Sequence, residues 1–481
     1  MPVVTRFAPS PTGYLHVGGL RTALYAYLFA KQHNGKFILR IEDTDQKRYV
    51  EGAVESLQNA LRYFDLNWDE GPIFQSHRTE IYQKHAQELL ANGKAYRCFC
   101  TPEELEKMRE EQSKLKIAPK YDRRCYELPT EKVQEKMAAG VPFVVRQLIP
   151  YKDIDFVDLI RGDMHFHGKD IDDQVLIKSD GLPTYHLANV VDDHEMEITH
   201  VIRGEEWLPS TPKHLWLYEA FGWTPPQYAH LPLLLNPDRS KLSKRQGDVA
   251  AEDFVAKGYL KEAMINFIAF LGWNPGTEEE IFSMDDLVKR FSLDRVQKAG
   301  AVFNLEKLDW LNRHYLRAKT PEELEALLLP LLEKEEWYTP ELLSALAPEQ
   351  KKAILTSVQT RMKTLVDGPA MLKPFLLPEL NYKRELFFSE KMKVDEQTVK
   401  LALKNALPAL EALDNYTDEE AIKAALVTVI EKLGLKNGQV LWPLRVALTN
   451  EEYSPGVFEL CRVMGKELTL KRLKAAAAFF Q

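Results

Sequence analysis

The chain has 481 residues, 45% of them hydrophobic and 28% charged, which is typical of a globular protein with several domains rather than one core. Its net charge of −8 argues against a protein that coats nucleic acid nonspecifically, although local basic surfaces remain compatible with binding one structured RNA. Because no apolar run approaches the ~20 residues of a membrane helix, no signal peptide is recognisable and four cysteines are too few for a disulfide framework, we expect a cytoplasmic protein without a membrane partner.

The N-terminal region begins with a strand–helix–strand pattern. Strands are expected at 3–7 and 37–41, and the helix between them is expected to start at Gly18 or Gly19 and to end near residue 34. Short connections of this kind predict a βαβ unit with a parallel sheet, whose ligands lie beyond the carboxyl ends of the strands. Residues 10–16 and Glu42 fall there. Two further helices are expected at 54–64 and 79–92.

The pattern changes between residues 96 and 173, which we interpret as an insertion. A charged helix is expected at 102–112, followed by short β-like runs at 143–145 and 156–167. The βαβ pattern is expected to resume at 175–177, 185–191 and 198–202, followed by a helix at 211–221 and an apolar strand within 228–235.

After residue 247 the chain is predicted to be helical. Short helices are expected at 252–257, 260–271, 284–291 and 305–315. A capping box that starts at Thr320 then opens a helical region that runs to the last residue. One helix of this region is expected to include residues 354–365, with Met362 and Leu365 on its core face and Arg361 on its flank.

Two loops have the composition of a nucleotide-binding site. The first, residues 7–19, contains Pro and Gly turns ahead of a helix, and its small residues let a phosphate approach backbone N–H groups at the helix N-terminus. The second, Lys241-Leu242-Ser243-Lys244-Arg245, places three cations around a serine and can neutralise a polyphosphate. Taken alone, the second loop is better explained as a solvated turn and His16 as a turn histidine. Together, the two loops can hold opposite ends of one nucleotide.

These residues carry a resemblance to a known family. Two segments resemble the first and second signatures of class I aminoacyl-tRNA synthetases: Pro9-Ser10-Pro11-Thr12-Gly13 with His16-Val17-Gly18-Gly19, and Lys241–Arg245. Within that class the chain resembles bacterial-type glutamyl-tRNA synthetases through residues 40–45, 180–194 and 203–207. It departs from the common signatures at Val17, Gly19, Leu242 and Arg245, where many members carry isoleucine, histidine, methionine and serine.

The resemblance implies an α/β fold with a Rossmann-like parallel-sheet catalytic domain, an inserted α+β acceptor-binding domain and all-helical anticodon-binding domains. In this chain the catalytic domain would cover 1–97 and 174–250, the insertion 98–173, a helical stem-contact domain 251–320 and the anticodon-binding domain 321–481. The implied activity is that of a glutamate–tRNA ligase, which uses ATP with Mg²⁺ to convert L-glutamate to glutamyl-adenylate and transfers it to the 3′ end of tRNA(Glu) in protein synthesis. Such enzymes are usually monomers.

The resemblance also implies roles for individual residues. His16, Lys244 and Lys241 would be catalytic, stabilising charge on the reacting phosphates. The implied ATP-binding residues are Pro9, Ser10, Thr12, Gly13, His16, Gly18, Lys241, Ser243 and Lys244. The implied glutamate-binding residues are Arg6, Ser10, Glu42, Tyr185, Asn189, Arg203 and Trp207. Arg203 would meet the side-chain carboxylate of the substrate and Glu42 its ammonium group. The alternatives are a surface ion pair of Arg203 with Glu205 or Glu206, and packing roles for Asn189 and Trp207.

Two further sites are implied by similar enzymes. Cys98, Cys100 and Cys125 resemble a zinc site, in which Glu127 takes the place of the histidine or tyrosine that the family pattern puts two residues after the third cysteine. The alternative is three reduced cysteines without a metal. Arg361 occupies the place from which enzymes that charge only glutamate tRNA read the third anticodon base, and its alternative is a solvated helix flank.

Three rival functions can be weighed against that of a glutamate–tRNA ligase. A glutaminyl-tRNA synthetase binds a neutral side chain, so a buried guanidinium at Arg203 would lack an anionic partner and be costly. The shortened relative that modifies a tRNA nucleoside lacks a tail comparable to the residues beyond 321. A paralogue that binds tRNA without charging it does not need His16, Glu42, Arg203 and Lys244 all intact. Whether tRNA(Gln) is also charged stays open.

Overall fold

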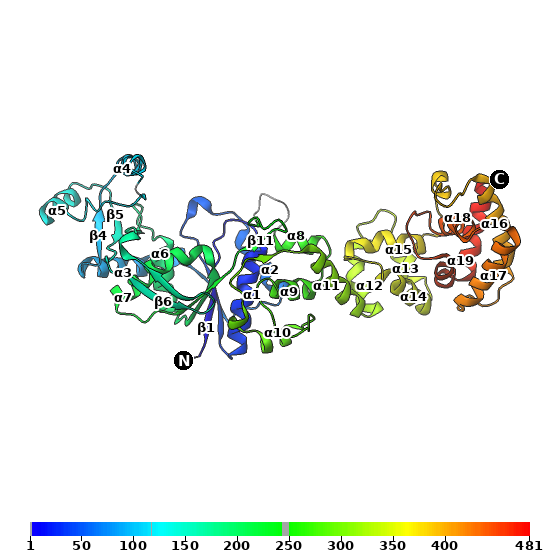
Figure 1. Ribbon diagram of the computed structural model, residues 1–481, viewed down its shortest axis with the longest axis horizontal. Coiled ribbons are helices and arrows are strands. Elements are labelled where there is room, and N and C mark those ends of the chain that lie inside the picture. Colours follow the sequence, from blue (N-terminus) through cyan, green and yellow to red (C-terminus); the bar gives the residue numbers. More distant parts are fainter. Residues whose placement is uncertain (1, 117, 243–249) are drawn as a thin grey trace. The chain divides into compact units, whose positions relative to one another are not determined.

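The structure, a computed structural model, describes residues 2–116, 118–242 and 250–481 (Figure 1). The chain forms two compact units. Unit 1 comprises Met1–Ala256 and Lys261–Leu308, and unit 2 comprises Lys257–Leu260 and Asp309–Gln481. Among the described residues, none of the helices combines the length and the apolar composition that a bilayer crossing demands. The predicted fold class, a largely parallel α/β sheet followed by a helical C-terminal region, is confirmed.

Unit 1 is built on a seven-stranded sheet with the order β3-β2-β1-β9-β10-β6-β7. Its strands are β1 (Val4–Phe7), β2 (Lys36–Ile41), β3 (Glu70–Phe74), β6 (Ile154–Asp158), β7 (Gly162–Phe166), β9 (His200–Gly204) and β10 (Gln227–Leu231). All neighbours pair in parallel except the edge strand β7, which is antiparallel to β6. Successive residues of β1 and β10 are buried, so both faces of the sheet are covered there, as parallel sheets require.

The helices of unit 1 lie close to their predicted positions. They are α1 (Val17–Gln32), α2 (Ala53–Tyr63), α3 (Thr79–Ala91), α6 (Tyr185–Glu195), α7 (Thr211–Phe221), α8 (Ala251–Ala256), α9 (Lys261–Ala269) and α10 (Met284–Arg290). The α1 helix begins one residue before the expected glycines because His16 caps it. Strand β3 was not predicted, since its half-exposed residues form no apolar run. Two short strands, β11 (Leu234–Leu235) and β12 (Ala301–Val302), pair with each other.

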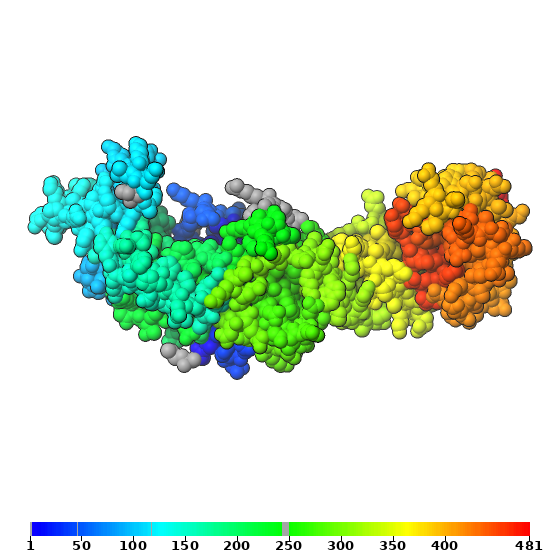
Figure 2. All heavy atoms as spheres, in the orientation of Figure 1, coloured from blue at the N-terminus to red at the C-terminus, as the bar shows by residue number. Residues whose placement is uncertain are grey.

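A second, antiparallel sheet lies in the predicted insertion. Its strands are β4 (Ala95–Cys98), β5 (Val144–Gln147) and β8 (Val175–Ile177). They are accompanied by α4 (Pro102–Lys114) and α5 (Thr130–Ala138), the cyan elements of Figures 1 and 2. The expectation that the parallel pattern resumes at 175–177 is therefore wrong, because β8 completes this antiparallel sheet instead.

The expectation that residues 98–173 form one separate insertion is also wrong in part. The β6–β7 hairpin leaves the small sheet and extends the edge of the main sheet, where Asp158 pairs with Tyr228 of β10. The buried carboxylate of Asp158 also accepts the backbone N–H groups of Ile160 and Arg161, which fixes the turn of the hairpin. The alternation of apolar residues along 156–167 indicates strands but not which sheet they join.

Unit 2 is helical. The chain from residue 305 onward forms α11 (Leu305–Ala318), α12 (Pro321–Leu332), α13 (Pro340–Ser344), α14 (Pro348–Gln359), α15 (Gly368–Leu376), α16 (Glu396–Glu411), α17 (Glu419–Leu433), α18 (Asn437–Thr449) and α19 (Val457–Phe479). The capping box at Thr320 is confirmed: its hydroxyl accepts the Glu323 N–H at 3.2 Å, and the Glu323 carboxylate accepts the Thr320 N–H at 2.8 Å.

The single helix expected over 354–365 is wrong, because α14 ends at Gln359. Gln359 is buried and its amide donates to the carbonyl groups of Leu316 and Lys319, which holds the end of α14 against the end of α11. Met362 is still buried, but it follows the helix instead of extending it. Arg361 therefore lies beyond the helix and not on its flank.

Candidate active site

A cavity of about 300 Å³ opens beyond the carboxyl ends of β1, β2 and β9. Most of the residues expected from sequence line it: Arg6, Pro9, Ser10, Thr12, Gly13, His16, Gly18, Glu42, Tyr185, Arg203 and Trp207. Asn189 and Lys241 are not among the lining residues, and Ser243 and Lys244 lie outside the described residues. The cavity therefore occupies the position that parallel α/β sheets use for ligands.

Arg203, at the end of β9, is a buried cation surrounded by uncharged acceptors. Its Nη1 donates to the Tyr185 hydroxyl at 3.0 Å, and its Nη2 donates to the Thr211 hydroxyl at 2.9 Å. Within the described part of the chain, no carboxylate forms an ion pair with this guanidinium, and Glu205 pairs with Arg161 instead. The surface ion pair considered as an alternative is therefore wrong, and the uncompensated charge favours an anionic ligand.

His230 and Asp158 hold the Arg203 guanidinium from behind. The Nε of Arg203 donates to Nε2 of His230 at 3.1 Å, and Nδ1 of His230 lies 2.6 Å from a carboxylate oxygen of Asp158. Burial, reinforced by the Arg203 cation and only partly opposed by Asp158, lowers the pKa of His230 to about 4. The ring is therefore neutral at pH 7, with its proton on Nδ1 facing Asp158 and Nε2 left as the acceptor for Arg203.

A second group of charges surrounds Arg6 and Glu42. Arg6 and Arg40 both donate to one oxygen of Asp193, at 3.1 and 2.8 Å, and Arg40 also donates to Glu42 at 3.2 Å. Burial raises the pKa of Glu42, although the Arg40 guanidinium opposes part of that rise. For Asp193, burial raises the pKa but Arg6 and Arg40 outweigh it and leave the pKa below its ordinary value. Glu42 thus lines the cavity as a carboxylate tethered on one side, which suits an ammonium ligand.

The loop before α1 presents His16 to the same cavity. Nδ1 of His16 accepts the Gly18 N–H at 2.9 Å, so the proton of a neutral ring is on Nε2. A Cβ atom on Gly18 would lie only 3.2 Å from that nitrogen, which explains the need for a small residue there. The loop is joined to the end of β2 by a hydrogen bond from the Glu42 N–H to the Pro9 carbonyl at 2.9 Å.

Four expected ligand-binding residues differ in their surroundings. The rings of Tyr185 and Trp207 lie at the wall of the cavity with centroids 4.3 Å apart and planes tilted by 37°. Asn189 is one turn after Tyr185 on α6 and is buried, and in the residues that the structure describes its Nδ2 has no hydrogen-bond partner. Lys241 is exposed, and its backbone forms an antiparallel bridge with Leu235.

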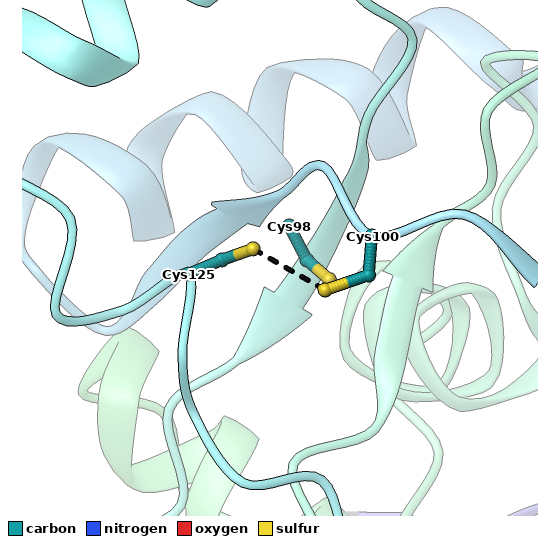
Figure 3. Close-up of side chains that lie close together, drawn as sticks. All are labelled: Cys98, Cys100 and Cys125. Carbon is teal, nitrogen blue, oxygen red and sulfur yellow. Dashed lines mark hydrogen bonds between the residues drawn. The ribbon is translucent and has the colours of Figure 1, made fainter. Parts of the chain in front are cut away.

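Cys98, Cys100 and Cys125 converge, with their sulfur atoms all within 4.8 Å of one another (Figure 3). The hydroxyl of Tyr121 lies 3.3 Å from the Cys98 sulfur and 3.4 Å from the Cys100 sulfur. A hydrogen bond from Cys125 lowers the pKa of Cys98 to about 4, although burial opposes this. Glu127, in the turn formed by residues 124–127, is exposed and is not part of the group.

Arg361, in unit 2, forms a two-pronged ion pair with Glu459 at the start of α19. The two guanidinium nitrogens lie 2.9 and 2.6 Å from the two carboxylate oxygens. The side chain of Arg361 is 36% exposed, so this pair remains accessible from solvent.

Several residues of the site were not identified from sequence. Asp193 and Arg40 lie within segments used for the family resemblance, while Thr211, His230 and Asp158 lie outside them. The available signal was a polar residue at a buried position of a strand, as His230 is in β10 and Asp158 in β6. Whether these residues lie near Arg203 depends on the order in which the strands pair, and the periodicity of the sequence does not reveal that order.

Comparisons with known proteins agree with this geometry. Residues 2–310 match the family model for the catalytic domain of class I tRNA synthetases (E and Q), and residues 317–477 match an anticodon-binding domain. Glutamate–tRNA ligases of Chlorobium luteolum and Clostridium botulinum are 46% and 47% identical, over 98% of this chain and 97% of each relative. The crystal structure of a glutamate tRNA ligase from Elizabethkingia meningosepticum in complex with its amino acid aligns with a TM-score of 0.88 at 38% identity, covering 100% of both chains. The chain belongs to the glutamate–tRNA ligase family of class I aminoacyl-tRNA synthetases.

Proposed function

We propose that the cavity of unit 1 binds L-glutamate and ATP, forms glutamyl-adenylate and transfers the glutamyl group to the 3′ end of tRNA(Glu). The observation that carries this proposal is the Arg203 guanidinium, which is buried, fixed by neutral acceptors and without an ion-pair partner among the described residues. A dicarboxylic amino acid supplies the missing anion, whereas glutamine does not.

Glutamate fits the cavity with its side-chain carboxylate on Arg203 and its ammonium group on Glu42. Tyr185 and Trp207 would line the side chain. Asn189 does not line the cavity, but its Nδ2, unpartnered among the described residues, is a donor suited to a carboxylate oxygen and would have to turn towards the ligand. Arg6 and Ser10 would lie towards the α-carboxylate.

The reaction then proceeds in two displacements. The α-carboxylate oxygen of glutamate attacks the α-phosphorus of ATP, and the bond to pyrophosphate breaks. Next, a ribose hydroxyl of the tRNA attacks the carbonyl carbon and releases AMP. The Nε2–H of His16 would donate to a phosphate oxygen as charge develops, and backbone N–H groups at the start of α1 would assist. Pro9, Thr12, Gly13 and Gly18 would lie against the nucleotide.

The basic loop would complete the ATP site. Lys241, Ser243 and Lys244 are proposed to meet the departing pyrophosphate. The groups of acidic, histidine or cysteine side chains that can hold a metal among the described residues lie away from the cavity, so Mg²⁺ would enter with the nucleotide and neutralise part of its charge.

The decisive test is tRNA charging by an Arg203→Gln variant. Removing one partner of a buried charge pair costs about 2–5 kcal/mol, so kcat/KM for glutamate should fall about 30- to 4,000-fold, with the KM for ATP nearly unchanged. Arg62→Gln, on the exposed face of α2, is the matched control and should charge normally. Undiminished glutamate charging by Arg203→Gln would refute the proposed role.

The amino acid and the tRNA can be identified separately. ATP–pyrophosphate exchange should appear with glutamate once tRNA is added. Exchange with glutamine but not glutamate would instead assign the chain to glutaminyl-tRNA synthetases. Charging assays with separate tRNA(Glu) and tRNA(Gln) show whether both are substrates.

We further propose that Cys98, Cys100 and Cys125 hold a structural Zn²⁺ with the Tyr121 oxygen in the fourth position. Three sulfur atoms and one oxygen in contact are a suitable donor set, and the ion would tie the end of β4 to the loop at 121–125. Elemental analysis should give the same zinc content, at least one zinc per chain, for the wild type and for Glu127→Gln. Tyr121→Phe should bind zinc more weakly, and loss of zinc in Glu127→Gln alone would restore Glu127 as the ligand.

The helical unit 2 is proposed to bind the anticodon arm, and the helices between 251 and 320 to contact the tRNA stem, in a monomeric cytoplasmic enzyme. Arg361 would read an anticodon base only after leaving Glu459, so this role predicts that Glu459→Gln strengthens tRNA(Glu) binding and that Arg361→Ala weakens it. If both variants bind tRNA(Glu) as tightly as the wild type does, Arg361 is only a surface ion-pair residue.

A further inference from the structure

Three side chains with metal-binding atoms meet at the open end of the β6–β7 hairpin, outside both the cavity and the cysteine cluster. Asp153 directly precedes β6, His165 lies on β7 and His167 directly follows it. All three side chains are about half exposed, at 50%, 51% and 52%. The hairpin belongs to the outer edge of the main sheet (Figure 1, β6).

The three atoms are spaced as the ligands of a tetrahedral ion are. Nε2 of His165 lies 3.3 Å from Nδ1 of His167, which lies 3.0 Å from Oδ2 of Asp153, and the third side of the triangle is 3.7 Å. Zinc bonds of about 2.0–2.1 Å in tetrahedral geometry separate neighbouring ligand atoms by about 3.3–3.4 Å. The triangle therefore matches one face of such a coordination shell.

Neighbouring groups orient two of the three ligands, His165 and Asp153, towards the cluster. Asp155, directly opposite His165 in the hairpin, lies 2.6 Å from Nδ1 of His165, so Nε2 is the nitrogen that faces the cluster. A carboxylate behind an imidazole ligand is the usual support in zinc sites. The other oxygen of Asp153 accepts the Gly168 N–H at 3.3 Å, which leaves Oδ2 for the cluster.

The backbone also fixes the distance between the two ends of the hairpin. A Cβ atom on Gly168 would lie 2.2 Å from the Lys152 carbonyl oxygen, so the chain segments that carry Asp153 and His167 are in direct contact. Close backbone packing and strand pairing thus fix the backbone positions from which the three ligand side chains extend.

With the proton of a neutral His165 ring on Nδ1 facing Asp155, Nε2 of His165 is an acceptor, and a proton on Nδ1 of His167 would serve the contacts to both His165 and Asp153. A divalent cation in the place of that proton would bind Nε2 of His165, Nδ1 of His167 and Oδ2 of Asp153 at once. Two imidazole nitrogens and one carboxylate oxygen suit Zn²⁺ and other borderline transition-metal ions better than Mg²⁺ or Ca²⁺.

We propose that Asp153, His165 and His167 form a binding site for a divalent transition-metal ion of the zinc class, with water in the remaining position. The ion joins the two ends of the hairpin and stabilises the edge of the main sheet, because the folded hairpin binds it and the unfolded chain has no such arrangement. The site is independent of the tRNA-charging activity.

The test is titration calorimetry of the full-length, tag-free, metal-stripped chain with Zn²⁺. The wild type should bind one equivalent more than His165→Ala/His167→Ala, whatever the cysteine cluster takes up. The matched control His33→Ala/His77→Ala removes two exposed imidazoles elsewhere in unit 1 and should keep that equivalent. Asp155→Asn, which removes only the support behind His165, should weaken the affinity about 10-fold.

Cobalt substitution distinguishes this site from the cysteine cluster by its spectrum. Co²⁺ bound to thiolates gives sulfur-to-metal charge-transfer bands, whereas a site of nitrogen and oxygen ligands gives only d–d bands. His165→Ala/His167→Ala should lose d–d intensity, keep any charge-transfer bands and charge tRNA at the wild-type rate. Equal zinc stoichiometry and affinity in wild type and this variant, or the same loss in the His33/His77 control, would overturn the proposal.

Discussion

Replacing Asp158 by asparagine should weaken the use of glutamate, although Asp158 does not line the cavity. The Oδ2 atom of Asp158 accepts the Nδ1 proton of His230 at 2.6 Å, which leaves Nε2 of His230 as an acceptor for Arg203. An amide nitrogen in the place of Oδ2 is a donor, so His230 must accept it at Nδ1 and carry its proton on Nε2. Two donors, Nε2–H of His230 and Nε–H of Arg203, then face each other across 3.1 Å.

The expected loss in kcat/KM for glutamate follows from one buried contact that becomes repulsive. A buried donor without an acceptor costs about 1–3 kcal/mol, and this displaces the guanidinium that is to meet the substrate carboxylate. At 1.36 kcal/mol for each factor of ten, kcat/KM for glutamate should fall about 5- to 150-fold. The fold should persist, because the asparagine carbonyl keeps the bonds that Oδ1 accepts from the N–H groups of Ile160 and Arg161, at 3.0 and 2.8 Å.

The assay is steady-state charging of tRNA(Glu) with glutamate and ATP varied in turn. The KM for ATP should change little, because the perturbation acts at the amino-acid end of the cavity. Asp163→Asn, the same substitution at an exposed position of β7, is the control and should be neutral. A folded Asp158→Asn variant with wild-type kcat/KM for glutamate would show that the proton position on His230 does not govern Arg203.

Two other changes probe separate parts of the site. His16→Ala removes a donor to the reacting phosphate and should lower kcat about 100- to 1,000-fold in single-turnover charging, with tRNA affinity in a filter-binding assay near normal. Burial, together with Lys213 and Arg203, lowers the pKa of His186 from its ordinary 6.5 to about 4, and its Nδ1 faces Nε2 of His214, whose pKa is also lowered. Because the unfolded chain binds the proton more readily between these values, His186 should reduce the free energy of unfolding by about 2 kcal/mol as the pH falls from 6.5 to 5. Urea unfolding at pH 7 and pH 5 should show a smaller loss for His186→Gln, and an identical loss would contradict the shift.

The parallel sheet, most helices of unit 1 and the capping box at Thr320 were predictable because each depends on a local pattern. The place of residues 10–16 and Glu42 was predictable because the ends of parallel strands meet at one edge. Arg6, Tyr185, Arg203 and Trp207 were expected only from the family resemblance. The end of α14 at Gln359 was not, since a side chain that reaches a different helix decides it.

Contacts between distant segments account for the other differences. The neutral acceptor His230 of β10 and the Asp158 carboxylate of β6 behind it both lie far from Arg203 in sequence. The convergence of Tyr121 on the cysteines likewise depends on how the loop before Cys125 folds back on β4. Spacing along the chain shows which residues are chemically suited to such sites but not which of them meet.

Strand β6 carries a residue that supports Arg203, and it belongs to the stretch of sequence between β3 and β9. The proposed selection of glutamate therefore depends in part on that stretch. Asp158, the anion behind His230, belongs to a segment flanked on both sides by strands of the small antiparallel sheet. An enzyme shortened by excising that whole stretch would lose this anion along with the small sheet. Exchange of the stretch between related ligases by recombination would also exchange the residue at position 158, so the small sheet and the anion behind His230 would be exchanged together.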